Sequence, residues 1–150
     1  MTEKTKYRGE SLFFQKQKDY KDGCRIYAIN NLIERKALSE KTFNKYCLEF
    51  DRIYKCKGTQ KFFFLASDNN IISFILSKFK VSTTYYPPNS IKSIEYLLET
   101  TTRFIVFSSQ HIWCCRKHNN VWYSFDSIQN SPSKLRPKEL NIKFGYIVVN

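Results

Sequence analysis

The stretch that decides the fold is CRIYAINNLI, Cys24–Ile33, which follows directly on the Asp22-Gly23 pair. Its apolar residues recur at intervals of three and four, the spacing that gives an α-helix one apolar face. Asp-Gly is a common turn dipeptide, so we expect the helix to begin at Cys24 and to run to about Lys36. The sequence therefore places a thiol in the first turn of a helix.

A β-hairpin is predicted much later in the chain, around Asn119-Asn120, because Asn tolerates the positive φ angles of a two-residue turn. In the register set by this turn, Cys115 pairs with Ser124, and His111 lies on the same face as Asp126, one diagonal step away. Diagonal neighbours have Cα atoms about 7–8 Å apart, within reach of an imidazole and a carboxylate. A slip of one residue would place the two groups on opposite faces.

A thiol at a helix start, followed by a His and an acid on a later hairpin, is the residue order of a papain-like cysteine hydrolase. The helix N-terminus and a nearby imidazolium would favour the thiolate of Cys24. His111 would act as acid and base, and Asp126 would hold its tautomer. The Cys24 backbone N–H and the Gln17 amide are the candidate oxyanion-hole donors, with Gln15 in reserve. The pattern predicts an acyl-thioester intermediate that water hydrolyses.

These residues resemble the Josephin family of papain-like deubiquitinases. The family's active-site helix carries Asn-Asn-Leu at the offset where Asn30-Asn31-Leu32 follow the candidate nucleophile. Its second motif, a His, an aromatic-rich strand, a turn and Trp-Phe-Asn-Leu-Asn/Asp-Ser, is similar to His111 with WYSFDS at 122–127. FFQKQ at 13–17 and GYIVV at 145–149 also fit. The resemblance implies a Cys-His-Asp triad that cleaves peptide or isopeptide bonds at the C-terminus of ubiquitin or a ubiquitin-like modifier.

The chain departs from the family pattern in three places. Gln17 lies two residues farther from the cysteine than the family's Gln, and Ile112 follows the His where the family usually has Trp. The middle of the chain is short, and the helical hairpin that grips ubiquitin in the family has no residue-by-residue match. Catalysis is therefore better supported than ubiquitin as the substrate.

The remaining pattern predicts an α+β domain over residues 1–150. It has the papain-like cysteine protease fold, with N-terminal helices packed on a C-terminal antiparallel sheet. Residues 1–22 are expected to be loop or short helix, and Phe62-Phe63-Phe64 are expected in the core. Further helices are expected after the N-caps Ser39, Ser67-Asp68 and Ser90, and strands at 81–86, 103–108, 111–117, 121–127 and 144–149.

Bulk properties limit the possible partners. The formal charge is +12, which favours acidic partners, but the basic residues are scattered, so nucleic acid is at most a secondary partner. The N-terminus has no apolar signal segment, and the five cysteines lack framework spacing, which predicts free thiols in a soluble, cytoplasmic, monomeric protein without a membrane partner. Cys114 and Cys115 are adjacent and so point to opposite faces of a strand, and we expect neither a metal nor a cofactor.

Two alternatives remain open at this stage. One is a papain-like peptidase that processes a polyprotein or leader peptide, because the Gln, Cys, His, Asp order also suits bacteriocin-processing peptidases. The other is a catalytically inactive basic module that binds nucleic acid or an acidic protein, which would show strongly salt-dependent binding.

Overall fold

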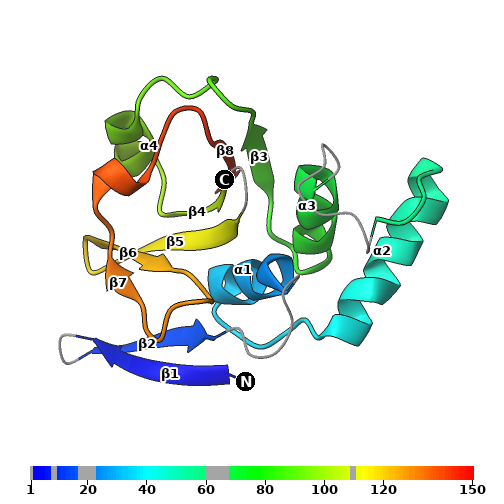
Figure 1. Cartoon of the computed structure of the whole chain (residues 1–150), viewed down its shortest axis with the longest axis horizontal. Coiled ribbons are helices and arrows are strands. Elements are labelled where there is room, and N and C mark those ends of the chain that lie inside the picture. The colour runs from blue at the N-terminus through cyan, green and yellow to red at the C-terminus, as the bar shows by residue number, and fades with distance from the viewer. Residues whose placement is uncertain (1, 8–9, 17–22, 60–67, 109–110) are drawn as a thin grey trace.

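The computed structural model describes residues 2–7, 10–16, 23–59, 68–108 and 111–150. In chain order its elements are β1 (Thr2–Tyr7), β2 (Glu10–Gln15), α1 (Cys24–Ile33), α2 (Glu40–Tyr54), α3 (Asp68–Lys78), β3 (Thr83–Tyr86), α4 (Ile94–Thr100), β4 (Arg103–Phe107), β5 (Ile112–His118), β6 (Val121–Phe125), β7 (Ser133–Lys134), the short 3-10 helix η1 (Pro137–Glu139) and β8 (Gly145–Val149). Figure 1 shows this arrangement.

The centre of the fold is a six-stranded antiparallel sheet with the strand order β3-β8-β4-β5-β6-β7. Helix α1 packs on this sheet against β4 and β5, and it also contacts α3. Figure 1 shows α3 and then α2 beyond α1, at the side of the sheet away from β7. Helix α1 therefore covers the sheet formed by the second half of the chain, α3 and α2 follow beside it, and the expected α+β arrangement is confirmed.

Alternation along the strands divides the buried side chains between two cores, because successive strand residues point to opposite faces. On β4, Ile105 joins the core that contains α1, α2 and α3, whereas Phe104 and Val106 join a second core with α4. On β5, Cys114 belongs to the first core and Cys115 to the second, as expected for adjacent strand residues. The first core is the one that includes Cys24.

The prediction of loop or short helix for residues 1–22 was wrong for the part that the structure describes. Strands β1 and β2 form an antiparallel hairpin with Tyr7 opposite Glu10 (Figure 1). Leu12 and Phe14 of β2 are buried in the core that contains α1. The alternation in this segment is short and its first strand is polar, so the strand signal comes from the pairing of the two segments and not from either one alone.

Two of the expected helix boundaries can be compared directly. Ser39 is the N-cap of α2, and its hydroxyl accepts a hydrogen bond from the Thr42 amide at 3.1 Å, as expected. Helix α1 ends at Ile33, earlier than the expected Lys36, because Glu34 adopts a left-handed conformation with φ 61°.

The N-cap expected for α4 was wrong. Ser93, not Ser90, accepts a hydrogen bond from the Tyr96 amide, and α4 begins at Ile94. The Ser90 hydroxyl instead donates to the Pro87 carbonyl at 2.6 Å, as part of the turn that follows β3. The apolar pattern did not distinguish the two serines, and the extended backbone of Ser93 makes it the cap.

Some of the segments singled out in the sequence cannot be compared with the structure. Phe62-Phe63-Phe64 and the Ser67 cap lie outside the described residues. Among the residues that the structure describes, none of the helices has the length and apolar character to cross a membrane.

Candidate active site

Cys24 is the first residue of α1, and its side chain is 2% exposed. Gly23 precedes it as the N-cap without a side-chain hydrogen bond, and the first turn contains no acidic residue. The free amides of a helix start and its dipole favour negative charge, and no carboxylate of the first turn competes for them. The helix start therefore offsets part of the cost that burial imposes on a thiolate at this position.

His111 and Asp126 lie just outside the β5–β6 hairpin, before β5 and after β6. The Asn119-Asn120 turn has φ angles of 50° and 63°, and Cys115 pairs with Ser124, so the predicted register is confirmed. His111 Nε2 lies 2.5 Å from Asp126 Oδ1. The sequence thus correctly brought this imidazole and carboxylate together.

Several contacts hold the orientation of this pair. The His111 ring stacks on Trp113, with centroids 5.8 Å apart and planes inclined by 19°. The backbone amide of His111 donates to the Ser108 hydroxyl at 3.1 Å. Asp126 Oδ1 also accepts a hydrogen bond from the Ile128 amide at 3.2 Å. Since Nε2 contacts the carboxylate, Nδ1 is the ring nitrogen that can exchange a proton with the thiol and the substrate.

Two arginines define the direction in which α1 crosses the sheet. Arg116 of β5 donates to the Asn31 carbonyl, and Arg103, its cross-strand partner on β4, donates to the Leu32 carbonyl at 2.9 Å. Both carbonyls belong to the last turn of α1, so the end of α1 lies beside the later part of β5.

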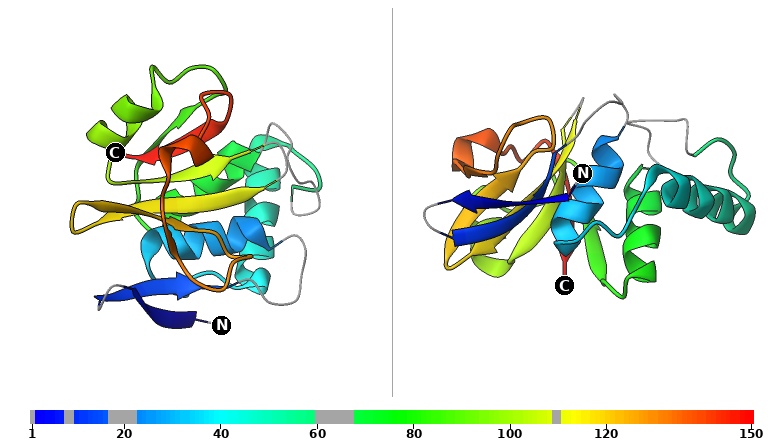
Figure 2. Two further views of the ribbon diagram at one scale, coloured as in Figure 1. Left: turned by 60° about the vertical axis from the view of Figure 1, so that its left-hand side comes forward. Right: turned by 90° about the horizontal axis from the view of Figure 1, so that it is seen from below.

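Helix α1 and strand β5 therefore run in the same direction (Figure 2). The helix rises about 10 Å from Cys24 to Asn31, and the strand about 16 Å from His111 to Arg116. The start of α1 consequently faces the start of β5, and Cys24 shares a buried cluster with Ile112, the residue after His111. The candidate nucleophile and the candidate base lie at the same end of the fold.

An amide network joins β2 to α1. Asn31 Oδ1 accepts from the Gln15 backbone amide at 2.7 Å, and Asn31 Nδ2 donates to the Gln15 carbonyl at 3.1 Å. Asn30 donates to Gln15 Oε1 at 2.7 Å and exchanges two hydrogen bonds of 2.9 Å with the backbone of Leu38. The Asn pair therefore fixes the chain on both sides of α1, as buried polar groups need partners.

Of the two candidate glutamines for the oxyanion hole, the structure describes only Gln15. Gln17 lies outside the described residues. Gln15 is described, and its amide oxygen is bound by Asn30, six residues along α1 from Cys24. Six residues of helix correspond to about 9 Å, and the role of Gln15 as the reserve oxyanion-hole donor stays a prediction.

Two buried arginines were missed by sequence reasoning. Arg116 also donates to the Phe13 carbonyl at 3.1 Å, and its guanidinium lies 3.7 Å from the centroid of the Phe125 ring. Arg25, the residue after Cys24, is 1% exposed and donates to the Thr59 carbonyl at 3.0 Å. Their burial could have been inferred from the sequence, because each is a basic residue at an inward position of an otherwise apolar segment.

The other cysteines do not resemble reactive thiols or metal ligands. None of the five cysteines, all of them in the described residues, forms a disulfide, and Cys56 is exposed. Burial raises the pKa of Cys114 to about 12 and also raises that of Cys115. Within the described ranges, no group of three or more His, Cys, Asp or Glu side chains could hold a metal ion.

Comparison with known proteins gives one family. The model of the family described as Josephin matches residues 20–145, a range that contains Cys24, His111 and Asp126. A search of curated protein sequences found no significant match. Because the family match covers most of the chain and the α+β architecture agrees with it, the chain belongs to the Josephin family and has its papain-like fold.

Proposed function

We propose that the chain is a thiol-dependent hydrolase that releases ubiquitin or a ubiquitin-like modifier. The observation that carries the proposal is the 2.5 Å contact between His111 and Asp126 at the end of β5 that faces the start of α1. Membership of the Josephin family supports a deubiquitinase-type cysteine protease. Membership of that family is the basis for the choice of modifier.

The reaction would begin at the Cys24 sulfur. His111 takes the thiol proton through Nδ1, and the sulfur attacks the carbonyl carbon of the bond between the modifier's C-terminal glycine and a lysine amine. The helix start and the Cys24 backbone N–H stabilise the negative charge on the oxygen. His111 then gives the proton to the departing amine, which leaves an acyl-thioester.

Water completes the cycle. His111 takes a proton from the attacking water, the thioester carbon–sulfur bond breaks, and the modifier leaves with a free carboxylate. Cys24 recovers its proton from the imidazolium. Asp126 stays ionised throughout, and its role is to hold the ring and to stabilise the imidazolium form.

A ubiquitin derivative with a C-terminal electrophile tests this function directly. The wild-type chain should form a covalent adduct, and Cys24→Ala should abolish it. His111→Ala should slow adduct formation by about a hundredfold or more, the usual contribution of a positioned acid–base group. His118→Ala, which alters the other histidine of the chain, and Cys56→Ala, which removes the exposed thiol, are matched controls that should label normally.

The outcomes separate the alternatives. An adduct that survives Cys24→Ala would exclude this nucleophile. Absence of adducts with ubiquitin and with ubiquitin-like electrophiles, while Cys24 is alkylated by iodoacetamide in a His111-dependent manner, would exclude the modifier and leave a papain-like peptidase. Absence of both reactions in the folded protein would exclude the hydrolase.

A further inference from the structure

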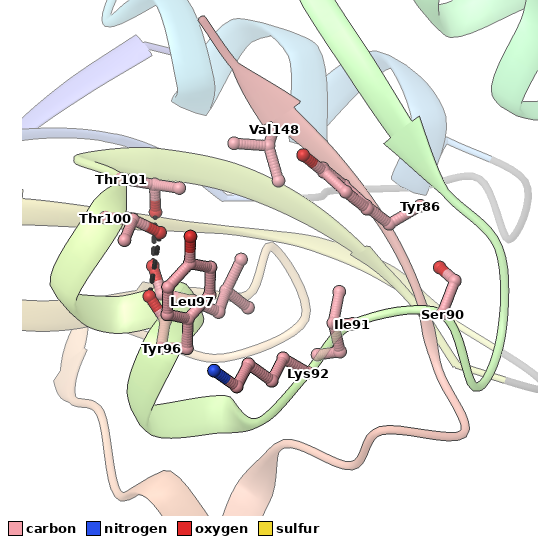
Figure 3. Close-up of a pocket in the computed structure, with 9 residues that line it drawn as sticks. All are labelled: Tyr86, Ser90, Ile91, Lys92, Tyr96, Leu97, Thr100, Thr101 and Val148. Carbon is pink, nitrogen blue, oxygen red and sulfur yellow. Dashed lines mark hydrogen bonds between the residues drawn. The ribbon is translucent and has the colours of Figure 1, made fainter.

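A concavity lies on the opposite side of the sheet from Cys24, between α4, the end of β3 and β8 (Figure 3). Its volume is about 210 Å³, and none of its lining residues belongs to the proposed catalytic apparatus. Leu97 and Val148, which line it, belong to the core that contains α4, whereas Cys24 belongs to the other core. The pocket is therefore separate from the candidate active site.

The walls of this pocket are apolar and aromatic. Leu97 and Val148 are buried, and Ile91 is half-buried beside them. Tyr86 and Tyr96 stand on opposite sides of the pocket, and they are 37% and 52% exposed (Figure 3). Two aromatic rings flanking an apolar floor favour a flat aromatic group between them, because ring pairs gain energy beyond the area they bury.

The size of the pocket decides what kind of ligand fits. An apolar cavity of about 150 Å³ holds benzene, so 210 Å³ accommodates an aromatic side chain with little space left. Sites for complete drug-sized ligands are larger, about 300–1,000 Å³. The volume therefore favours a single side chain of a partner protein over a whole metabolite.

The polar groups add a preference for negative charge. The Thr100 and Thr101 hydroxyls donate to the carbonyls of Tyr96 and Leu97 within α4, so they are not available as donors to a ligand (Figure 3). The Lys92 ammonium lies 5.6 Å from the centroid of the Tyr96 ring, and it has no ion pair within the described ranges. The acidic residues of α4 do not line the pocket. The charge beside the aromatic walls is thus positive, as is the formal charge of the chain, +12.

We propose that this pocket docks an aromatic side chain of a partner protein, from a segment in which Asp or Glu follows the aromatic residue. The ring enters between Tyr86 and Tyr96 and contacts Leu97, and the carboxylate pairs with Lys92. Bound on the far side of the sheet, the partner leaves the Cys24 face accessible, so that partner binding and hydrolysis can occur together.

The experiment uses the full chain with Cys24→Ala, which removes turnover, and titrates it with the blocked pentapeptide Gly-Phe-Asp-Glu-Gly while amide NMR shifts are recorded. We expect saturable shifts at Tyr86, 91–97 and Val148. Replacing the peptide's Phe by Ala should weaken binding about tenfold or more, because the buried ring supplies most of the affinity. Lys92→Ala should weaken it by roughly two- to fivefold, the effect of one exposed ion pair.

Two variants provide the controls. Lys138→Ala removes an exposed lysine of η1 and should leave the affinity unchanged, which separates a local effect of Lys92 from an effect of net charge. Thr100→Trp, at an exposed position of the rim, should block the pocket and abolish the shifts without altering the core. Adduct formation with the ubiquitin electrophile is measured separately on the protein with Cys24 intact, so failure of one proposal does not imply failure of the other.

Three results would overturn the proposal. Shifts that do not saturate at millimolar peptide would mean that the pocket takes no such segment. Equal binding of the Phe and Ala peptides would indicate attraction by the basic surface alone. Phenylacetate binding as tightly as the peptide would assign the pocket to a small aromatic acid instead of a protein partner.

Discussion

Asp126 uses one carboxylate oxygen for two contacts, with Oδ1 lying 2.5 Å from His111 Nε2 and 3.2 Å from the amide of Ile128. The second contact comes from the turn that follows β6, so the backbone holds the carboxylate in place before any substrate arrives. The imidazole is therefore oriented by a group that is itself fixed, which limits the number of positions that Nδ1 can occupy.

Asp126→Ala should lower kcat/KM by roughly ten- to a hundredfold, because a hydrogen bond to a charged group contributes about 1.5–3 kcal/mol. Asp126→Asn should retain more activity, since its amide oxygen can still accept from the ring. Turnover of a fluorogenic ubiquitin substrate gives both values. Equal losses in the two variants would mean that the negative charge, and not the orientation, is what matters.

Asn30→Ala should destabilise the fold by about 2–4 kcal/mol. The substitution leaves the Leu38 amide, the Leu38 carbonyl and Gln15 Oε1 without their partner, and each buried polar group left alone costs about 1–3 kcal/mol, part of which water recovers. Urea unfolding measures the change. Asn70→Ala on α3, where the residue is exposed, is the control, and a loss of similar size there would show that the effect is not specific to the network.

Arg116→Met should cost about 2–4 kcal/mol, because the Phe13 and Asn31 carbonyls lose their donor while the aliphatic packing is largely kept. Lys117→Met, at the neighbouring position of β5, serves as the comparison in the same urea titration. The two variants remove one positive charge each. If both lose stability equally, the net charge and not the anchoring of α1 is responsible.

Ser93→Ala should destabilise the protein by about 1 kcal/mol, because it removes the side-chain acceptor for the Tyr96 amide at the start of α4. Ser90→Ala should cost less, since that hydroxyl donates to one carbonyl in an exposed turn. Thermal unfolding of the pair orders the two effects. A larger loss of stability in Ser90→Ala than in Ser93→Ala would mean that Ser90 caps the helix.

Stability should fall in alkaline solution through Cys114. Burial raises the pKa of this thiol from 9.0 to about 12, so between these values the folded protein holds a proton that the unfolded chain has lost. The contribution is complete below pH 9 and is lost as the pH rises towards 12. The slope of the free energy of unfolding between pH 8.5 and 10.5 should be shallower in Cys114→Ala than in wild type or in Cys56→Ala.

Features that depend on residues close together in the chain could be predicted from the sequence, and features that depend on distant residues could not. The start of helix α1, the Asn119-Asn120 turn and the pairing of His111 with Asp126 depend on local periodicity and on a two-residue turn, and all three were predicted correctly. The β1–β2 hairpin was missed because its first strand carries no apolar pattern of its own.

The positions of the buried polar side chains needed tertiary structure. Arg116 contacts carbonyls of β2 and α1, which are distant in the chain, and no periodicity indicates such partners. The same holds for Gln15, whose backbone amide donates to Asn31 and whose side-chain oxygen accepts from Asn30, partners that no spacing indicates. Residue spacing identifies candidates for chemistry, and the competition for hydrogen bonds decides which of them are available.

The network between β2 and α1 has a practical consequence for anyone who expresses this protein. A fragment cut to the limits of the family match, 20–145, would lack Gln15 and the Phe14 ring, and it would also lose all of β8 except Gly145. Asn31 would then lose both of its side-chain hydrogen bonds and Asn30 one of its three, and the sheet would lose the strand between β3 and β4. Such a fragment should aggregate, and a failed assay on it would say nothing about the chemistry of Cys24.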